Sequence, residues 1–508
     1  MKLGVDFGTT RIVTAVVDRG NYPLVPFETP EATFEWLPPL VALRADERLY
    51  GWDAWAKQAD PDWTVVRSLK RYLEDAGPQT VLEAGGTRVR VAALLEGLLL
   101  KFREGLQDHF GRQEKFEVML GVPANANSNQ RFLTVDGFRR AGFTVLGLLN
   151  EPSAASIEFG HRQRFSGSLL VYDLGGGTFD ASLVELDEKA HTVIATEGIS
   201  TLGGDDFDRV LGELALGAEK LASLDPGALF RLEEECRRQK EALHPNSRRM
   251  VVDLDLVEEG LGQQIIAVPD FYERCRPLLD ETVAATARLA STTEIDALYI
   301  TGGGSELPLV ARMLRDEFGR KVKRSEYTRS ATAIGLAIQA DSSTGYELRE
   351  VFTRNFGVWR ESEAGHRMVF DPIFPRGTRL PASGEPPLTV QRTYYPVHNI
   401  GHFRYLEATQ VGVDEQPAGD ITVWDEILFP FDPAQRGFDL ERTAVERTLD
   451  QPQEVQECYA CDSTGVVTAT VRNLTSDYGH DYRLGKWSAK AAVVKPKGNK
   501  RARKTTAT

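Results

Sequence analysis

Three glycine-rich turns, each directly after an apolar run, are the segments of this chain best suited to chemistry. They are Gly8-Thr9-Thr10, Gly175-Gly176-Gly177-Thr178 and Gly302-Gly303-Gly304-Ser305. Because glycine tolerates positive φ and close approach of a ligand, successive backbone N–H groups of such turns can point at phosphate oxygens. One such turn is a weak signal, since a glycine after a strand is usually only a turn. Three together predict a phosphate site.

Two aspartates end the apolar runs that lead into the first two turns, Asp6 and Asp173. Carboxylates that converge from two sides would hold Mg²⁺, largely through its water molecules, and the ion would offset the charge of a triphosphate. Capping of the turns is the alternative role. We predict that Asp6 and Asp173 are the metal-binding pair.

The elements that carry these turns have a repeated strand–turn–strand pattern, at Lys2–Val17 and again at Leu169–Val184. This similarity suggests two related lobes that face each other. Elsewhere up to Ala340, helical and strand periods alternate, which is typical of an α/β protein. We expect helices at Val91–Phe110, Ser128–Ala141, Leu229–Leu243 and Pro277–Ala290, and strands at Glu117–Pro123 and Ala297–Thr301.

The length of 508 residues is too great for one ordinary core. Near residue 341 the alternating helical and strand periods give way to short β-rich runs with glycine and proline turns. We predict an α/β domain over residues 1–340, a linker over 341–352, a β-rich domain over 353–488 and a basic disordered tail over 489–508. The net charge of −14 argues against a protein that coats nucleic acid. Only the tail, with seven Lys and Arg residues, offers a surface for RNA or other acidic partners.

The four cysteines are too few for a disulfide framework, and no secretory signal or membrane span is visible, so we expect a cytoplasmic protein. Cys458 and Cys461 form a lone CxxC pair. Zinc would need two further ligands at suitable spacing, so ordinary thiols are the favoured interpretation.

Several motifs together resemble the seventy-kilodalton heat-shock chaperone (DnaK-like) family. The resemblance covers about residues 1–340. It rests on Leu3-Gly4-Val5-Asp6-Phe7-Gly8-Thr9-Thr10, Gly121-Val122-Pro123-Ala124, Asn150-Glu151-Pro152, Val171-Tyr172-Asp173-Leu174-Gly175-Gly176-Gly177-Thr178-Phe179-Asp180, Leu202-Gly203-Gly204-Asp205 and Ile300-Thr301-Gly302-Gly303-Gly304. The resemblance implies an actin-like, two-lobed ATPase that binds ATP or ADP with Mg²⁺ and slowly hydrolyses ATP.

The resemblance also implies roles for individual residues. Lys70 would reach the γ-phosphate, Glu151 would position the attacking water, Asp173 would bind metal and water, and Thr178 would contact the γ-phosphate. Pro123 and Arg131 match positions that relay the nucleotide state. The remaining nucleotide-binding positions would be Gly8, Thr9, Thr10, Gly175, Gly176, Gly177, Asp180, Gly203, Gly204, Lys240, Gly302, Gly303 and Gly304.

The departures from the family lie on the adenosine side of the implied site. Lys240 is retained in the helix Cys236–His244, but family Glu, Arg and Ser positions hold Arg237, Glu241 and His244. An arginine that stacks on adenine in the family falls at Glu306, and a family Asp falls at Arg329. Base recognition should therefore be altered, and a cation–π stack of about 1–2 kcal/mol is lost or rebuilt.

The second half resembles the family's peptide-binding β-sandwich only loosely. Two segments, Asn399–Glu407 and Trp424–Phe431, have no obvious counterpart, and packing is favoured over client contact for them. The linker Tyr346–Phe352 lacks the family's leucine-rich pattern, and the residues after the β domain leave no room for a helical lid. The implied partners are unfolded or partner polypeptide, a J-domain protein and an exchange factor.

Three functions remain open. The first is a lidless chaperone whose nucleotide state gates peptide binding by the β domain. The second is a nucleotide-dependent scaffold or sensor for one dedicated partner, which the altered linker favours. The third is a small-molecule kinase on the same fold, against which the appended β domain argues.

Overall fold

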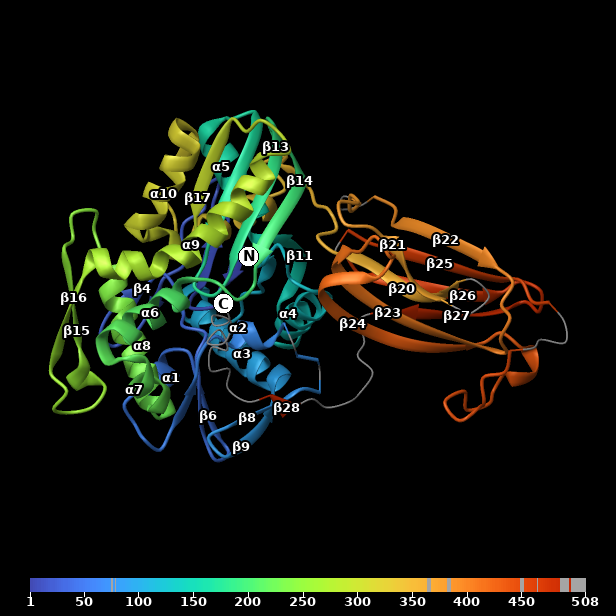
Figure 1. Ribbon diagram of the computed structural model, residues 1–508, viewed down its shortest axis with the longest axis horizontal. Helices are drawn as coiled ribbons and strands as arrows, with labels where there is room; N and C mark the ends of the chain where they lie inside the picture. The colour runs from blue at the N-terminus through green and yellow to red at the C-terminus, as the bar shows by residue number, and fades with distance from the viewer. Residues whose placement is uncertain are drawn as a thin grey trace, which may run out of the picture. The chain divides into compact units, whose positions relative to one another are not determined.

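The computed structural model describes residues 1–74, 76–77, 79–362, 367–381, 385–447, 452–463, 465–484 and 493–494. The chain divides into two compact units (Figure 1). Unit 1 comprises residues 1–189, 197–346 and 490–508, and unit 2 comprises residues 190–196 and 347–489.

The first lobe of unit 1 is built on a sheet of four strands in the order β11-β10-β1-β2. The strands are β1 (Lys2–Phe7), β2 (Ile12–Val16), β10 (Glu117–Val122) and β11 (Thr144–Asn150). β1 pairs in parallel with β10 and antiparallel with β2. Helices α3 (Val91–Phe110) and α4 (Ser128–Arg140) contribute apolar side chains to the core of this lobe, and both lie where helical periodicity predicts them.

The second lobe repeats this arrangement. Its central strands have the order β18-β17-β12-β13-β14. They are β12 (Gly167–Leu174), β13 (Phe179–Asp187), β14 (Ala190–Ile199), β17 (Ala297–Thr301) and β18 (Val322–Arg324). As β1 does in the first lobe, β12 has an antiparallel hairpin partner, β13, on one side and a parallel strand, β17, on the other. Turns that follow β1, β12 and β17 therefore lie at equivalent ends of the two sheets.

Helices α5 (Glu151–Gln163) and α11 (Ala331–Ala340) pack against each other at the centre of unit 1. Two glycines permit this packing. A Cβ on Gly335 would lie 1.8 Å from the carbonyl oxygen of Ala154, and a Cβ on Gly4 would lie 2.2 Å from the backbone nitrogen of Ala337. Only a residue without a side chain lets α11 approach α5 and β1 this closely.

The outer part of the second lobe consists of helices α6 (Gly204–Leu216), α7 (Ala218–Ser223), α8 (Pro226–Glu241), α9 (Val268–Ala290) and α10 (Pro308–Phe318). The prediction that a helix begins at Pro277 was wrong. α9 begins at Val268 and contains Pro277 in its interior. The proline in the first turn of this helix, where proline is favoured, is Pro269. Unit 1 also contains β3 (Phe27–Glu28), β4 (Thr33–Phe34), β5 (Val41–Arg44), β6 (Glu47–Tyr50), α1 (Trp52–Trp55), β7 (Thr64–Val66), α2 (Leu69–Tyr72), β8 (Val81–Ala84), β9 (Thr87–Arg90), β15 (Arg249–Asp253) and β16 (Gln263–Ala267).

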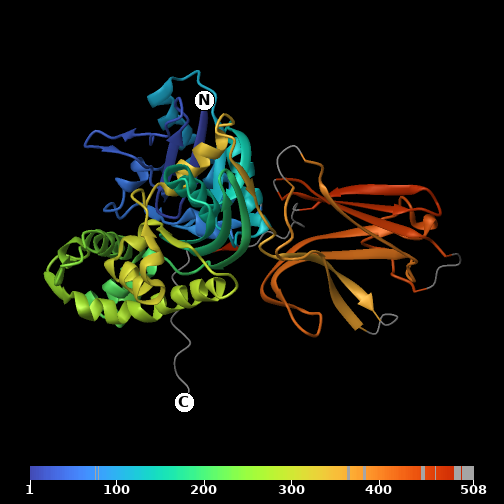
Figure 2. The same cartoon turned by 90° about the horizontal axis from the view of Figure 1, so that it is seen from above.

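Unit 2 is a sandwich of two antiparallel sheets (Figure 2). One sheet has the order β21-β20-β23-β24, from β20 (Asn355–Ser362), β21 (Arg367–Phe374), β23 (Ile400–Val411) and β24 (Pro417–Pro430). The other has the order β22-β25-β26-β27, from β22 (Leu388–Tyr394), β25 (Val455–Cys461), β26 (Val467–Asn473) and β27 (Tyr478–Arg483). The two segments without a family counterpart form β23 and β24, and four of their aromatic residues are buried in the sandwich core: Phe403, Tyr405, Phe429 and Phe431.

A buried polar cluster joins the two sheets of unit 2. Arg360 on β20 donates two hydrogen bonds, of 3.0 and 2.7 Å, to the carboxylate of Glu457 on β25, which is completely buried. The hydroxyls of Tyr394 and Tyr459 donate to the same carboxylate. Because every partner is satisfied, this cluster fixes the register of one sheet on the other.

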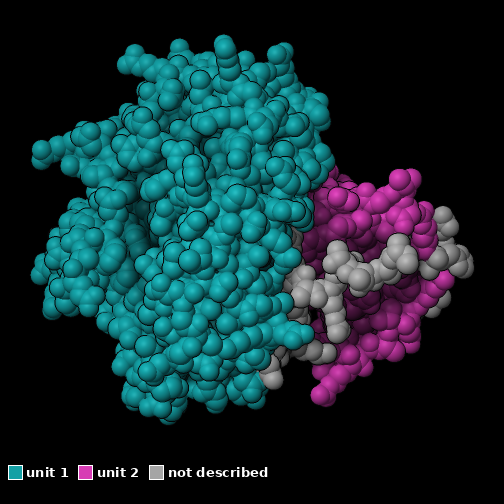
Figure 3. Space-filling model, turned by 60° about the vertical axis from the view of Figure 1, so that its left-hand side comes forward, with its two compact units in different colours: residues 1–189, 197–346, 490–508 teal, residues 190–196, 347–489 magenta. Residues whose placement is uncertain are grey.

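The segment predicted as a linker contains a short strand, β19 (Glu347–Arg349), which pairs in parallel with the first residues of β14, Ala190–Thr192. Figure 3 accordingly colours residues 190–196 with unit 2. Of the predicted tail the structure describes only β28 (Val493–Val494), which pairs in parallel with β8 of unit 1. The rest of the tail lies outside the described residues.

Cys458 and Cys461 lie on β25. Since side chains alternate along a strand, an i,i+3 pair points to opposite faces, and only Cys461 is buried. The two thiols therefore cannot bind one metal ion together. No helix in the described part of the chain is long and apolar enough to span a membrane.

Candidate functional site

The predicted phosphate turns of the two lobes face each other in unit 1. A Cβ on Gly176 would lie 2.7 Å from Thr10 Cγ2, and a Cβ on Gly177 would lie 2.7 Å from Thr9 Cγ2. The first turn is closed by a hydrogen bond of 3.0 Å from the Gly8 N–H to the Arg11 carbonyl. Gly176 and Gly177 let the two turns approach closely, because a side chain here would collide with the opposite turn.

The third turn and the start of α6 pack on the second turn. A Cβ on Gly304 would lie 2.7 Å from the Gly175 carbonyl oxygen, and a Cβ on Gly203 would lie 2.6 Å from Gly176. The Gly204 N–H donates to the Gly175 carbonyl at 2.9 Å. A Cβ on Gly302, which has φ +84°, would lie 2.3 Å from Asp173 Oδ1. Four glycine-containing segments therefore meet at one place, beside the carboxylate predicted to bind metal.

The predicted catalytic side chains surround this meeting point. Lys70 on α2 forms a buried ion pair with Glu151, the first residue of α5. Asp173 and Asp180 are cross-strand partners on β12 and β13, and both are buried. Together with Asp6 at the end of β1, they line the space between the lobes, as does Thr178.

The carboxylates are held at unusual pKa values. Burial raises the pKa of Asp6 to about 7, assisted by the charge of Glu151 and opposed by that of Lys70. Burial, with Glu151 contributing, also raises the pKa of Asp180 to about 7 and that of Asp173 well above its ordinary value. Burial alone would lower the pKa of Lys70, but Glu151 and Asp6 outweigh it and raise that pKa. One lysine thus does not balance the acidic charge.

This excess of buried carboxylates fits a divalent cation. Among the described residues, no group of three or more His, Cys, Asp and Glu side chains is placed to ligate a metal ion directly. Asp6 and Asp173 would therefore reach an ion mainly through its water shell, and this role stays a prediction.

Two arginines next to the motifs belong to the site and were missed by sequence reasoning. Arg71 donates a hydrogen bond of 3.0 Å to the Gly177 carbonyl and lies 3.6 Å from Asp205. Arg11, directly after Thr10, reaches the opposite lobe. The only available signal was a cation adjacent to a motif residue, which does not reveal a partner far away in sequence.

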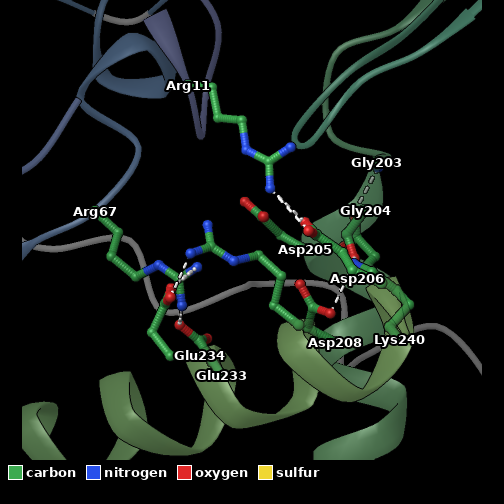
Figure 4. Close-up of polar contacts among 12 residues, drawn as sticks. Arg11, Arg67, Gly203, Gly204, Asp205, Asp206, Asp208, Glu233, Glu234 and Lys240 are labelled. Carbon is green, nitrogen blue, oxygen red and sulfur yellow. Dashed lines mark hydrogen bonds and ion pairs between the residues drawn. The ribbon is translucent and has the colours of Figure 1, made fainter. Parts of the chain in front are cut away.

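Lys240 lies on α8 at the start of the adenosine side. Its ammonium donates to the Gly204 carbonyl at 2.6 Å and lies 2.6 Å from Asp208 Oδ1 (Figure 4). Burial raises the pKa of Asp208 to about 7, with Lys240 opposing the shift. Lys240 thus connects the start of α6 to α8.

Three of the altered residues of the adenosine side, Glu241, Glu306 and Arg329, form one ion-pair network with Arg11. Arg11 binds Glu241 through contacts of 3.0 and 2.8 Å, and its guanidinium lies 4.8 Å from the ring centre of Trp36. Arg329 binds the same carboxylate at 3.0 Å and also pairs with Glu306. The family's charges are inverted at Glu241, Glu306 and Arg329, yet the inverted residues pair with one another.

Arg67 makes a second connection between the lobes on the same helix. Its guanidinium lies 2.9 Å from Glu233 and 2.7 Å from Glu234 of α8, and Figure 4 shows it pointing at both carboxylates. Arg11 and Arg67, both from the first lobe, therefore hold α8 at two points along its length.

Hollows that share lining residues surround this part of unit 1. The phosphate turns line a cavity of about 100 Å³. Beyond Lys240 and Glu241 lies a cavity of about 600 Å³, and a third of about 1110 Å³ lies between the lobes beside Arg67 and Arg71. The site therefore has room for more than a phosphate chain.

The predicted relay residues adjoin the catalytic side chains. Arg131 donates to the side chain of Asn150 at 2.6 Å, directly before Glu151. Pro123 lines the same small hollow as Lys70 and Asp180. Both positions therefore lie beside the catalytic candidates, and their relay role stays a prediction.

Comparison with known proteins agrees with this geometry. The Hsp70 protein family matches residues 2–355. A chaperone protein HscA homolog from Methylibium petroleiphilum is 30% identical over 410 residues, which cover 75% of this chain and 65% of that protein. A heat shock protein from Pyricularia oryzae is 28% identical over 535 residues, covering 94% of this chain and 84% of that protein.

The fold and the site define an actin-like, two-lobed ATP-binding domain followed by antiparallel sheets of a substrate-binding type, which confirms the predicted fold class. The chain belongs to the Hsp70 family, as its motifs indicated. It is a divergent member, at about 30% identity to these relatives.

Proposed function

We propose that this protein is an ATP-hydrolysing chaperone in which the nucleotide state of unit 1 controls polypeptide binding by unit 2. Phosphates would lie on Thr9, Thr10 and the Gly175–Gly177 turn. Lys70 would stabilise the charge that develops on the transferred phosphoryl group, and Glu151 would orient the attacking water.

The observation that carries this proposal is the buried Lys70–Glu151 pair among the glycine turns. A cation and a carboxylate held within hydrogen-bonding reach, beside backbone N–H groups, are the groups that phosphoryl transfer to water needs. Burial keeps the pair out of bulk water, where its electrostatic effect would be weak. A magnesium ion near Asp6 and Asp173 would supply further neutralisation of phosphate charge.

Unit 2 offers apolar surface for a polypeptide. Tyr395 and Val397, in the loop after β22, are 63% and 49% exposed. The buried Asn399 fastens this loop to the segment after β24, where Phe438 and Val445 are 64% and 58% exposed. An extended apolar chain could bind at this end of the sandwich. A J-domain protein and an exchange factor are the partners that the family suggests.

A scaffold that binds one dedicated partner is the second candidate. The pairing of β19 with β14 favours the scaffold, because this pairing gives the linker a fixed backbone partner. The leucine-rich pattern of the family's linker is absent from this segment. Stimulation of ATP turnover by several unrelated unfolded polypeptides would support the chaperone. Stimulation by a single protein would support the scaffold.

The catalytic assignment is tested by Lys70→Ala. We expect at least a hundredfold loss of steady-state phosphate release, because one preorganised charge in a catalytic site has an effect of this size. Nucleotide binding to the variant should still be detectable by calorimetry. Lys101→Ala is the matched control, since Lys101 is 37% exposed on α3 and pairs with surface acids. Normal turnover in Lys70→Ala would refute the assignment.

A further inference from the structure

The cavity of about 600 Å³ beyond the cleft lies between the end of α8, α9, the third glycine turn and α10. Lys240, Glu241, Gly303 and Gly304 line both this cavity and the cleft that holds the phosphate turns. One ligand can therefore extend from the phosphate turns into the larger cavity, whose volume is typical of small-molecule sites.

The inner wall of the cavity suits a flat ring. It is formed by Leu243 just after α8, by Leu307 just before α10, by Ala311 on α10, and by the ring of Tyr272 on α9. The guanidinium of Arg312 lies 5.3 Å from the centre of that ring. This wall would bind the nucleoside part of a nucleotide rather than its phosphates.

The rim of the cavity carries three arginines, Arg312, Arg315 and Arg324, from α10 and β18. Within the described residues, none of the three forms an ion pair with a carboxylate. Glu241 and Glu306, which also line the cavity, are already paired with Arg11 and Arg329. Asp316 is the remaining acid of the lining, so the rim is positively charged.

We infer that this cavity binds nucleotides that carry a second phosphate on the ribose, in addition to the 5′ chain. The inference rests on the proposed function, because it requires the 5′-phosphates to lie on the glycine turns. The nucleoside would then lie in the cavity beyond Lys240 and Gly303, which line both hollows. A phosphate on its ribose would meet guanidinium groups, which bind phosphate oxygens through paired, charge-assisted hydrogen bonds.

Calorimetry with the full chain tests the inference. The probes are AMP, adenosine 3′,5′-bisphosphate and adenosine 2′,5′-bisphosphate, with ADP as the reference for the nucleotide site. At least one bisphosphate should bind tenfold or more tightly than AMP. Comparison of the two isomers shows which ribose hydroxyl carries the recognised phosphate.

The variant Arg315→Ala/Arg324→Ala should abolish this preference and leave the affinity for ADP within about twofold, because neither arginine packs on the Tyr272 wall that would hold the nucleoside. Arg320→Ala is the control, because Arg320 is an exposed arginine near the end of α10 that does not line the cavity. Equal binding of AMP and both bisphosphates would overturn the inference, as would a preference that survives in the double variant. Failure of ADP itself to bind would refute the nucleotide site and, with it, this inference.

Discussion

At the scale of single residues, the candidate site has a phosphate side formed by motif residues and a base side formed by residues that are distant in the chain. Asp6, Thr9 and Asp173 stand inside contiguous motifs, so their types and spacing are visible in the sequence. Arg11 and Glu241 are far apart in the chain, and their pairing depends on how the two lobes close. The inverted charges at Glu306 and Arg329 predict altered base recognition, and the structure shows that these two residues form an ion pair with each other.

Asp208 gives a testable pH dependence. Because burial raises its pKa in the folded state to about 7, against about 4 in the unfolded chain, its stabilising contribution is complete below pH 4. It is lost as the pH rises towards 7. In the nucleotide-free protein, the free energy of unfolding should fall by about 1 kcal/mol between pH 6 and pH 8 through this group.

Urea unfolding of Asp208→Asn at both pH values measures that contribution. The difference in the free energy of unfolding between pH 6 and pH 8 should be smaller in this variant by about 1 kcal/mol. Asp6 and Asp180 would still contribute their own pH dependence. Asp187→Asn, at the exposed end of β13, should keep the full difference. An unchanged pH difference in Asp208→Asn would show that its carboxyl does not titrate in this range.

At the scale of elements, periodicity located the helices and strands whose local pattern is strongest. The strand at Ala297–Thr301 and the helix at Val91–Phe110 match the structure to the residue. What local pattern could not give was the start of α9, since a proline inside a long helix resembles a helix start. The pairing of β19 with β14 was also out of reach, because it joins segments distant in sequence.

The crossing of α5 and α11 leads to a prediction for Gly335. Gly335→Ala should lower the free energy of unfolding by about 1–3 kcal/mol, because the added methyl group would overlap the Ala154 carbonyl and force the helices apart. Gly212→Ala is the control, since a Cβ on this glycine of α6 meets nothing closer than 3.4 Å. That control should be neutral or stabilising by up to about 1 kcal/mol. Thermal or urea unfolding that ranks the two variants in the opposite order would contradict the account of this helix pair.

At the scale of the whole molecule, the two units divide the proposed work. Unit 1 contains the phosphate turns and the catalytic side chains, and unit 2 contains a sandwich whose sheets are locked together by Arg360 and Glu457. The predicted fold class is confirmed. It could be predicted because the lobes and the sandwich both consist of long runs of alternating elements. Coupling between the units could not be predicted from sequence, since the linker departs from the family pattern.

The measurement that tests the central claim most directly is the dissociation rate of a fluorescently labelled, unfolded apolar peptide from the full chain, in ATP and in ADP. If nucleotide state controls unit 2, dissociation should be at least tenfold faster in ATP, and Lys70→Ala should hold the fast rate because it cannot complete hydrolysis. Equal dissociation rates in ATP and ADP, from a protein that binds both nucleotides, would contradict the account.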